Sequence, residues 1–371
     1  MVRLLFFIEE LRGGGAEKVL CNLVNALDPE KFDVTVQTLW KADAAQCLRP
    51  GIRYRYCYGG KTAFNVRRSR LEAALGWTYP LHIKGRYDLE AAYLEFGSTK
   101  IMAGSTNRRA KKLAWVHCDL ARNLSDPAAF VAKASKWYDK YDRVVCVSQT
   151  VRDSFVALLG QPEKTIVLYN TVDDAEIREK ALAPLPEGLQ KRRMTVVSVG
   201  RLSPEKQFSM LLSIHRQLLD SGLPHDLWIL GEGPERPKLE AIIRENRLAD
   251  SVRLPGFCGN PYPCLRAADL LVCSSRFEGF STFVTEGVIL GKPIVTTDCS
   301  GMRELLGDSE YGLITENSEA ALLEGMRKML ASPSLRTRYS EKAAIRGRSF
   351  TAQELSKKTE LLLISLMEEK K

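Results

Sequence analysis

The sequence predicts an α/β protein built from two doubly wound, Rossmann-like domains. Short apolar runs alternate with helical patterns along its 371 residues, and this alternation is typical of parallel sheets. A chain of this length is long for one hydrophobic core and natural for two. The alternation stops after Asn170 in a polar segment that contains Pro184 and Pro186, and it restarts at Met194. The sequence therefore predicts two sheets joined by a linker.

The expected boundaries follow from this interruption and from the last helical pattern. We expect a first domain over 1–172, a linker over 173–193, a second domain over 194–350 and a C-terminal helix over 351–371. Leu355, Leu362 and Leu366 share one face of that helix, with charges opposite. Such a face suits either a membrane or the protein, and because the tail over 368–371 has no basic excess, we expect the helix to pack on the protein.

The composition limits the class of protein and its partners. The net charge is +9, and all of it lies in the first half: residues 1–172 hold 26 Lys and Arg against 17 Asp and Glu, whereas residues 173–371 hold 28 of each. This asymmetry indicates an anionic partner, such as a phospholipid surface, a nucleic acid or a phosphorylated substrate, or merely a basic surface. The nine cysteines form no C-x-x-C pair, and no apolar run is long enough to cross a bilayer. A reducing cytoplasm fits this pattern.

The chain opens with a strand, a glycine turn and a helix. Val2 to Ile8 is an apolar run, Gly13, Gly14 and Gly15 follow, and apolar residues from Ala16 to Leu27 recur at helical spacing. Glycines at such a turn let the backbone approach a ligand closely. The spacing is not that of the dinucleotide fingerprint, which needs G-x-G-x-x-G. On its own this turn is a weak signal.

The rest of the first half continues the alternation. Strands are expected at Phe32–Leu39, Ile52–Cys57, Leu89–Leu94, Leu113–His117, Val144–Ser148 and Ile166–Tyr169. A basic and aromatic segment, 61–86, interrupts them, and it is either an amphipathic surface element or a solvated helix. His117 ends one strand, at the edge where sites gather in parallel sheets. A lone histidine is more often structural, so His117 is a candidate only.

The second half opens with the strand Met194–Gly200 and the loop GRLSPEKQ. Ser203 and Pro204 are typical of a helix start, so Arg201 and Lys206 come from one strand-to-helix connection. A guanidinium fork and a lysine point charge suit a diphosphate, although two basic residues are also an ordinary surface feature. Two further loops follow strand-like runs, one with Gly231 and one with Phe257 and Cys258. Both are also consistent with ordinary turns.

The most informative stretch runs from Ala268 to Asp298. It predicts a strand at Leu270–Cys273, a small-residue loop, a helix to Leu290 and a second strand at Ile294–Thr297. Ligands of open parallel sheets bind beyond the carboxyl ends of the strands. We expect the amides of Phe280, Ser281 and Thr282 to be first-turn donors suited to a phosphate.

Two carboxylates frame this loop, with seven residues between them. Glu278 precedes the predicted helix and Glu286 lies two turns into it. In the simpler interpretation, Glu278 is a negative charge that favours the helix N-terminus, and Glu286 is an ordinary residue on the polar face of the helix. Read as a site, both hold hydroxyl groups of a sugar or ribose as charge-assisted acceptors.

Several of these motifs together resemble a known family. EGFSTFVTEG followed by GKPIVTTD resembles the E-x7-E signature of retaining nucleotide-sugar glycosyltransferases of family 4, which have the GT-B fold. GGGAEKVL, the W-x-H at Trp115–His117 and GRLSPEKQ are similar to further motifs of that family. The family usually has Gly-Leu or Gly-Ile where this chain has Ser281 and Thr282, so contacts to the sugar are expected to differ.

The resemblance implies a role for each candidate residue. It places Gly14 and Gly15 against the donor phosphates and the acceptor, and His117 near the transferred sugar. In the second domain, the resemblance places Arg201, Lys206 and the amides at 280–282 on the diphosphate. It places Gly231, Phe257 and Cys258 near the nucleobase. Glu286 is expected to bind the ribose, and Glu278 the transferred sugar. The implied fold is two Rossmann-like domains that face a central cleft, with the C-terminal helix over 351–371 packed back on the N-terminal domain.

The resemblance also implies the reaction and the partners. We expect transfer of a hexosyl or N-acetylhexosaminyl group, with retention, from a UDP-sugar to an acceptor hydroxyl, without a cofactor or metal ion and without nucleic acid. A lipid-linked saccharide of surface-polysaccharide synthesis is the expected acceptor, and peripheral contact with an anionic inner leaflet is the expected location. Trp77 and Tyr79 are expected at headgroup level. The cations expected to meet the membrane are Lys61, Arg67, Arg68, Arg70, Lys84, Arg86, Arg108, Arg109, Lys111 and Lys112. A GT-B epimerase or phosphorylase and a non-catalytic partner subunit remain as alternatives. Arg201, Lys206, Glu278 and Glu286 together argue against the last of these.

Overall fold

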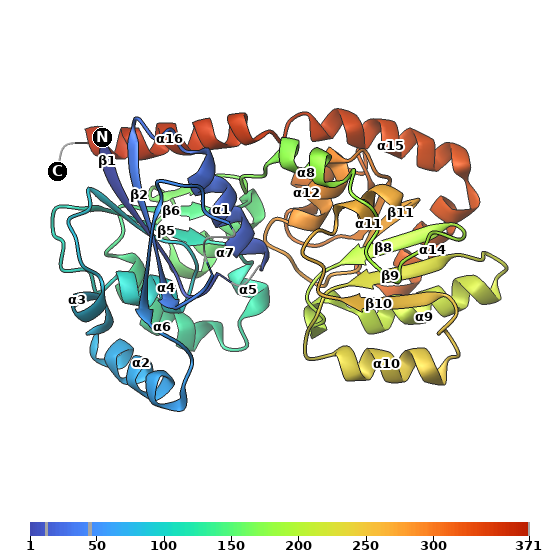
Figure 1. Cartoon of the computed structure of the whole chain (residues 1–371), viewed down its shortest axis with the longest axis horizontal. Coiled ribbons are helices and arrows are strands. Elements are labelled where there is room, and N and C mark those ends of the chain that lie inside the picture. The colour runs from blue at the N-terminus through green and yellow to red at the C-terminus, as the bar shows by residue number, and fades with distance from the viewer. Residues whose placement is uncertain (12–13, 44–46, 370–371) are drawn as a thin grey trace. The chain divides into compact units, whose positions relative to one another are not determined.

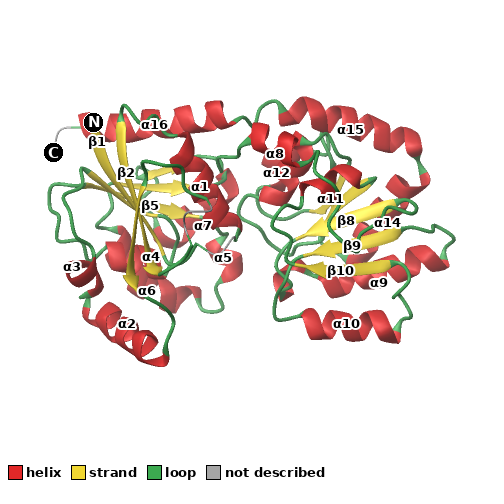
Figure 2. Ribbon diagram, viewed as in Figure 1, coloured by secondary structure: helices red, strands yellow, loops and turns green. Residues whose placement is uncertain are grey.

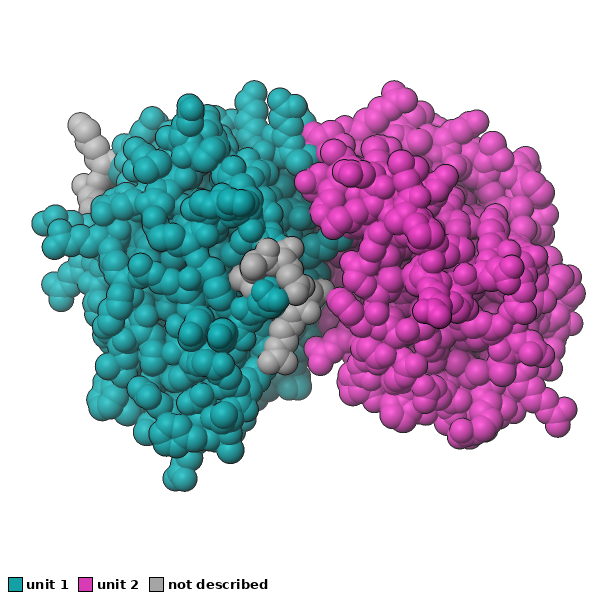
Figure 3. All heavy atoms as spheres, in the orientation of Figure 1, with its two compact units in different colours: residues 1–172, 352–371 teal, residues 173–351 magenta. Residues whose placement is uncertain are grey.

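The structure, a computed structural model, describes residues 1–11, 14–43 and 47–369 (Figure 1). These residues divide into two compact units, which Figure 3 draws in different colours. Unit 1 comprises residues 1–172 and 352–371, and unit 2 comprises residues 173–351.

Unit 1 is built on a seven-stranded, all-parallel sheet with the order β3-β2-β1-β4-β5-β6-β7. Its strands are β1 (Val2–Ile8), β2 (Phe32–Trp40), β3 (Arg53–Tyr58), β4 (Leu89–Ala92), β5 (Lys111–Val116), β6 (Arg143–Cys146) and β7 (Thr165–Val167). The interior strand β1 is fully buried from Leu4 to Ile8, as expected for a strand covered on both faces. The chain winds outward from β1 in both directions, so the strand order reverses between β1 and β4.

Helices connect most successive strands of unit 1, although β3 follows β2 without a helix between them (Figure 2). They are α1 (Gly15–Ala26), α2 (Ala63–Leu75), α3 (Thr78–His82), α4 (Gly97–Met102), α5 (Leu120–Asn123), α6 (Pro127–Tyr138) and α7 (Gln149–Leu159). The helix α16 (Ala352–Glu368) also belongs to this unit. It packs on α1 and buries Leu355, Leu363 and Leu366, and Glu360 accepts a hydrogen bond from the amide of Asp28 at 2.8 Å.

Unit 2 repeats the same plan with six parallel strands in the order β10-β9-β8-β11-β12-β13. The strands are β8 (Thr195–Val199), β9 (Asp226–Leu230), β10 (Val252–Gly256), β11 (Leu270–Cys273), β12 (Ile294–Thr297) and β13 (Leu313–Thr315). Both β11 and β12 have the bounds that the sequence predicts. The order reverses between β8 and β11, which makes the carboxyl ends of these two strands the topological switch point.

The helices of unit 2 pack on this sheet and on each other. They are α8 (Asp174–Lys180), α9 (Phe208–Asp220), α10 (Arg236–Glu245), α11 (Tyr262–Ala267), α12 (Thr282–Ile289), α13 (Met302–Leu306), α14 (Glu319–Ala331) and α15 (Pro333–Gly347). Phe208, Leu211 and Leu218 of α9 and Met326 of α14 lie in one buried core with Val272 of β11. The predicted fold class, two parallel-sheet α/β domains, is confirmed.

Residues 173–193, expected to form a linker, belong to unit 2. Asp173 caps α8, because its side chain accepts a hydrogen bond from the amide of Glu176 at 2.8 Å. Ile177 of α8 is buried, and α8 packs against α11 and α12. The proline-rich composition of 183–188 concealed this helix, which lies just before it.

Candidate functional site

Two of the charged residues that the sequence motifs single out, Lys206 and Glu278, lie in loops at the carboxyl ends of β8 and β11. Lys206 ends a short 3-10 turn, Pro204–Lys206, that follows β8, and α9 begins only at Phe208. Glu278 lies in the loop between β11 and α12. The two loops meet because β8 and β11 are neighbours in the sheet. The topological switch therefore brings together residues from two separate motifs.

Lys206 and Glu278 form an ion pair, with Nζ 2.6 Å from Oε1. Ser275 donates its hydroxyl to the same carboxylate oxygen at 2.7 Å. Only 21% of the Lys206 side chain and 13% of the Glu278 side chain are exposed. Burial by itself lowers the pKa of Lys206, but the charge of Glu278 outweighs it and holds that pKa above its ordinary value. Lys206 is thus a permanent cation within this site.

Hydrogen bonds fix the two loops to one another. The hydroxyl of Ser274 donates to the Lys206 carbonyl at 2.7 Å, and the amide of Arg276 donates to the Glu205 carbonyl at 2.7 Å. Thr297, at the end of β12, donates to the Ser275 carbonyl at 2.6 Å. Ser274 and Ser275 were missed by the sequence reasoning. Two serines directly after a buried strand, at the edge where sites gather, are the signal that could have identified them.

The start of α12 differs from the prediction. The helix begins at Thr282, and Ser281 is its N-cap, with Oγ accepting a hydrogen bond from the amide of Val284 at 3.4 Å. Phe280 therefore precedes the helix, and its ring is buried 6.1 Å from that of Phe350. Gly301 approaches this loop closely: its φ is +79°, and a Cβ there would lie 2.6 Å from the Gly279 carbonyl oxygen. The first-turn amides belong to Thr282 and Phe283 rather than to Phe280.

Glu286 lies on α12 in a largely buried position, with 6% of the residue exposed. The hydroxyl of Tyr262, from α11, donates to Glu286 Oε1 at 3.2 Å. Burial and the charge of Glu286 raise the pKa of Tyr262, so this tyrosine stays a donor. The bland reading of Glu286 as a solvated polar-face residue is wrong.

Arg201 and Gly231 occupy the loops that follow β8 and β9. The guanidinium of Arg201 is exposed and makes no hydrogen bond or ion pair within the described ranges. Gly231 has a φ of +143°, and a Cβ there would lie 1.9 Å from the Gly200 carbonyl oxygen. Its absent side chain lets the two loops approach, because any other residue would collide with the backbone of Gly200.

Phe257 and Cys258 follow β10 and have different surroundings. Phe257 is 64% exposed, which is unusual for a large aromatic residue. The thiol of Cys258 donates to the Asn260 carbonyl at 3.1 Å. An exposed ring at a strand end provides a flat apolar surface on which a base could stack.

The candidates of unit 1 lie at the carboxyl edge of its own sheet. Gly14 is the N-cap of α1, Gly15 is the first residue of that helix, and Gly13 lies outside the described residues. The ring of His117 contacts that of Tyr93 at 4.8 Å, and its buried Nε2 has no hydrogen-bond partner among the described residues. Burial lowers the pKa of His117 to about 3, so the imidazole is neutral at physiological pH.

Two carboxylates that follow strands of the unit 1 sheet were not predicted from the sequence. Glu95 is largely buried, and its Oε2 accepts a hydrogen bond from the amide of His117 at 2.9 Å. Glu9 follows β1, and a Cβ at Gly97 would lie 2.0 Å from its Oε1. Burial, and then the charge of Glu10, raise the pKa of Glu9. This edge of unit 1 therefore presents acceptors for ligand hydroxyl groups.

Two kinds of feature are absent from the part of the chain that the structure describes. It contains no group of three His, Cys, Asp or Glu side chains placed to hold a metal ion. Among its helices, none combines the length and apolar character that a membrane span requires.

Two family models match the chain, one on each side of the unit boundary. The model described as "Glycosyltransferase Family 4" matches residues 13–176. The model described as "Glycosyl transferases group 1" matches residues 183–346. The second range contains Arg201, Lys206, Glu278 and Glu286.

Curated relatives carry related names. The chain is 36% identical over 191 residues to the N-acetylgalactosamine-N,N'-diacetylbacillosaminyl-diphospho-undecaprenol 4-alpha-N-acetylgalactosaminyltransferase of Campylobacter jejuni. That match covers 51% of this chain and spans only half of the relative's length. It is also 28% identical over 340 residues to the lipopolysaccharide core biosynthesis glycosyltransferase LpsE of Rhizobium meliloti, covering 89% of this chain and 90% of the relative.

Solved structures share the fold along the whole chain. Anabaena HepE in complex with UDP and glucose superposes with a TM-score of 0.78 at 18% identity, covering 98% of this chain and all of that one. Sucrose-phosphate synthase of Thermosynechococcus elongatus gives a TM-score of 0.80 at 16% identity, with full coverage of both chains. At these identities the likeness establishes the fold. With both family models matched in sequence, the chain belongs to the family 4 glycosyltransferases of the GT-B fold.

Proposed function

We propose that this chain transfers a sugar from a UDP-sugar to a hydroxyl group of a lipid-linked saccharide, with retention of the anomeric configuration. The observation that carries the proposal is the Lys206–Glu278 ion pair at the switch point of unit 2, 2.6 Å apart. This pair places Lys206, a cation suited to bind a diphosphate, next to Glu278, a carboxylate suited to bind a sugar. The names of relatives that act on lipid-linked or lipopolysaccharide acceptors support the choice of acceptor.

Three side chains of unit 2 are available to bind different parts of the donor. Arg201 is exposed and has no partner within the described residues, so its fork is available to the diphosphate. Glu286 presents its carboxylate to the ribose from α12, and Phe257 presents a ring to the uracil. UDP complexes of structures with the same fold support a uridine nucleotide.

The chemistry breaks the bond between the anomeric carbon and the diphosphate oxygen and forms one to the acceptor oxygen on the same face. The leaving diphosphate takes the proton of the acceptor hydroxyl, and Arg201 and Lys206 stabilise the charge that develops on it. Glu278 already accepts hydrogen bonds from Lys206 and Ser275. It therefore suits orientation of the sugar better than covalent attack.

Three measurements test this function. A thermal-shift screen over nucleotide sugars should identify a UDP-sugar, because a donor at 100 times its dissociation constant stabilises by about 2.7 kcal/mol. Mass spectrometry should then detect transfer to a polyprenyl-diphosphate saccharide, and NMR of the product should show the donor's anomeric configuration. Stabilisation by no UDP-sugar, or a product of inverted configuration, would contradict the proposal. Sugar release that depends on phosphate, or epimerisation without transfer, would favour the phosphorylase or the epimerase.

A lipid-linked acceptor requires access to a membrane, and α2 with α3 offers a suitable surface (Figure 1). We define the α2–α3 surface by its exposed residues. The apolar members are Phe64, Leu71, Leu75, Trp77 and Leu81, each 48–73% exposed, and the basic members are Arg67, Arg70, Lys84 and Arg86. Apolar side chains surrounded by cations match an anionic bilayer interface.

Glu72 fixes the two helices of this surface. Its carboxylate accepts hydrogen bonds from Tyr58 at 2.5 Å and Arg68 at 2.6 Å, and lies 2.7 Å from His82 Nε2. Burial raises the pKa of Glu72, but these hydrogen bonds outweigh it and hold that pKa below its usual value. A buried anion thus ties α2 to α3 and to β3.

Two residues expected at this surface lie elsewhere. Tyr79 is buried and donates its hydroxyl to Glu90 at 2.6 Å, so it does not reach a bilayer. Lys111 is buried between Asp142 and Glu369, at 3.6 and 3.7 Å. The sequence gives the number of charged residues, but burial of a particular side chain depends on how the sheet and helices pack around it. Lys61, Arg108, Arg109 and Lys112, the other cations expected to meet the membrane, lie outside the α2–α3 surface.

A further inference from the structure

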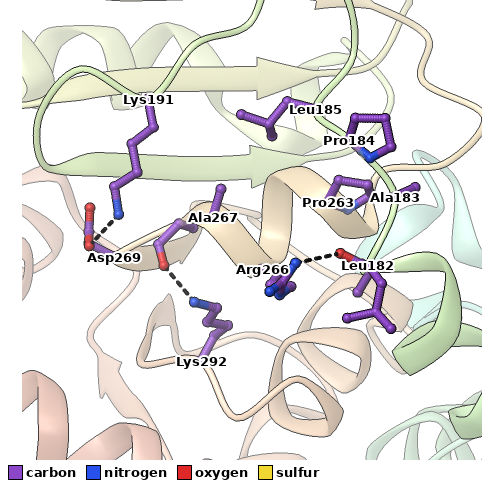
Figure 4. A pocket seen from close by; sticks show the side chains of 12 residues that line it. Leu182, Ala183, Pro184, Leu185, Lys191, Pro263, Arg266, Ala267, Asp269 and Lys292 are labelled. Carbon is purple, nitrogen blue, oxygen red and sulfur yellow. Dashed lines mark hydrogen bonds and ion pairs between the residues drawn. The ribbon is translucent and has the colours of Figure 1, made fainter.

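A second pocket lies at the other edge of the unit 2 sheet (Figure 4). Asp269 directly precedes β11 and Lys292 precedes β12 by two residues, so both mark amino ends of strands. Lys206 and Glu278 follow carboxyl ends. In a parallel sheet these edges are separated by the strand itself, about 13 Å for four residues. The pocket is therefore distinct from the proposed donor site.

Three cations and one carboxylate surround this pocket. Lys191 pairs with Asp269 at 2.8 Å, and the second oxygen of Asp269 accepts the amide of Thr195 at 2.8 Å. Asp269 is thereby fully engaged. Within the described residues neither Arg266 nor Lys292 forms an ion pair, although the charge of Asp269 also acts on Lys292.

Arg266 and Lys292 contact only backbone oxygens within the described residues. Lys292 donates to the Ala268 carbonyl at 2.9 Å, and Arg266 lies 3.5 Å from the Ala181 carbonyl. Burial, and then the nearby charge of Lys191, lower the pKa of Lys292. Three cations against one carboxylate leave an excess of positive charge in the pocket, and a bound anion would relieve the repulsion between the cations.

The remaining wall of the pocket is apolar. Leu182, Pro184 and Leu185 line one side and Pro263 faces them, as Figure 4 shows. The cavity volume is about 510 Å³, within the range of about 300–1,000 Å³ typical of small-molecule sites. A pocket of this size has room for a phosphate together with an additional group.

We propose that this pocket binds a soluble phosphorylated small molecule. Arg266 and Lys292 hold the phosphate, and Pro184 and Leu185 contact the apolar part of the ligand. Arg266 offers the bidentate fork that matches phosphate oxygens, whereas Lys292 adds a point charge from the turn before β12. The site is separate from donor binding and from the α2–α3 surface.

The test uses the full-length chain with Lys206→Ala, which weakens phosphate binding at the donor site. Binding of phenyl phosphate and of inorganic phosphate is measured by calorimetry at low ionic strength. Both should bind, with phenyl phosphate tighter because its ring contacts Pro184 and Leu185. Arg266→Gln should weaken phenyl phosphate binding by about tenfold or more, the loss expected for one charge-assisted contact.

Arg244→Gln is the matched control, because Arg244 is an exposed arginine on α10 of the same unit. It should leave the affinity for phenyl phosphate unchanged. Arg266→Lys should restore part of that affinity, which a folding defect would not allow. Equal affinities in Arg266→Gln and Arg244→Gln, or no binding once Lys206 is replaced, would overturn the proposal. Equal affinities for phenyl phosphate and inorganic phosphate would contradict the proposal that the ligand has an apolar part that contacts Pro184 and Leu185.

Discussion

Lys206 and Glu278 are 72 positions apart in the chain, yet their charged groups lie 2.6 Å apart. Each comes from a loop that follows a strand of the same sheet. The sequence had assigned them to separate parts of a donor, the diphosphate and the sugar. Their contact means that changes at either residue affect the other, both in catalysis and in stability.

Lys206→Ala should reduce turnover by about 100- to 1,000-fold, the scale of losing one stabiliser of developing negative charge. The substitution should also lower the free energy of unfolding by about 1–3 kcal/mol, because it leaves Glu278 largely buried and unpaired. The contact with Glu278, which the sequence does not show, is the cause of this loss of stability. Lys238→Ala, which removes an exposed lysine paired with Glu235 at 3.0 Å, is the control. Steady-state kinetics and urea denaturation measure both effects, and normal turnover would remove Lys206 from the site.

Glu286→Ala should weaken UDP binding by about 1.5–3 kcal/mol, the value of a hydrogen bond to a charged group. Glu278→Ala should lower turnover more than UDP affinity, because its expected partner is the sugar. Calorimetry with UDP alone separates the two roles. Equal losses of UDP affinity in the two variants would show that Glu286 and Glu278 do not bind the ribose and the sugar separately.

Phe257→Ala should reduce UDP affinity by about 1–3 kcal/mol, the range for one base stacked on an aromatic ring. Folding stability should stay constant, because the ring is 64% exposed. Phe257→Trp should retain the affinity. Ile345→Ala, at an exposed apolar residue of α15, is the control. An unchanged affinity in Phe257→Ala would place the base elsewhere.

Acid should destabilise the protein through a buried histidine pair. His215 Nδ1 lies 2.8 Å from His225 Nε2, and His215 Nε2 lies 2.9 Å from the Ser251 hydroxyl. Burial lowers the pKa of both, that of His215 to about 3. Their folded pKa values lie below the unfolded value of about 6.5, so this stability is complete above that pH and is lost as the pH falls toward 3.

His215→Gln should remove part of this dependence. Between pH 6.5 and 5 it should reduce the loss of unfolding free energy by about 1.5 kcal/mol, because one fewer histidine takes up a proton on unfolding. Denaturant titrations at several pH values provide the measurement. Parallel pH profiles for the two proteins would assign acid sensitivity to other groups.

The α2–α3 surface should bind vesicles that contain anionic lipid, and salt should weaken this binding. Arg67→Glu with Arg70→Glu should release the protein, and Phe64→Ser with Trp77→Ser should also do so by removing the interfacial anchors. The control is Lys133→Glu with Lys136→Glu, an equal charge change on α6. Co-sedimentation measures the bound fraction, and a protein that stays in the supernatant under all conditions would favour a soluble acceptor.

The sequence by itself determined the fold class, the bounds of β11 and β12 and the motifs that resemble those of family 4. These are local properties, because a buried strand of a parallel sheet appears as a short apolar run and a strand-end loop as small and charged residues. For the same reason the sequence indicated α16 and its apolar face. It misread 173–193, since prolines at 184 and 186 concealed the short helix before them.

Only the tertiary structure decided which side chains meet. The Lys206–Glu278 pair, the Tyr262–Glu286 hydrogen bond and the serines that fix the site depend on the neighbours that each strand takes in the sheet. Burial is decided in the same way: Tyr79 and Lys111 are covered, whereas Phe64 and Trp77 remain exposed. Neither outcome has a local sequence signal, because a side chain's environment comes from segments that are distant along the chain.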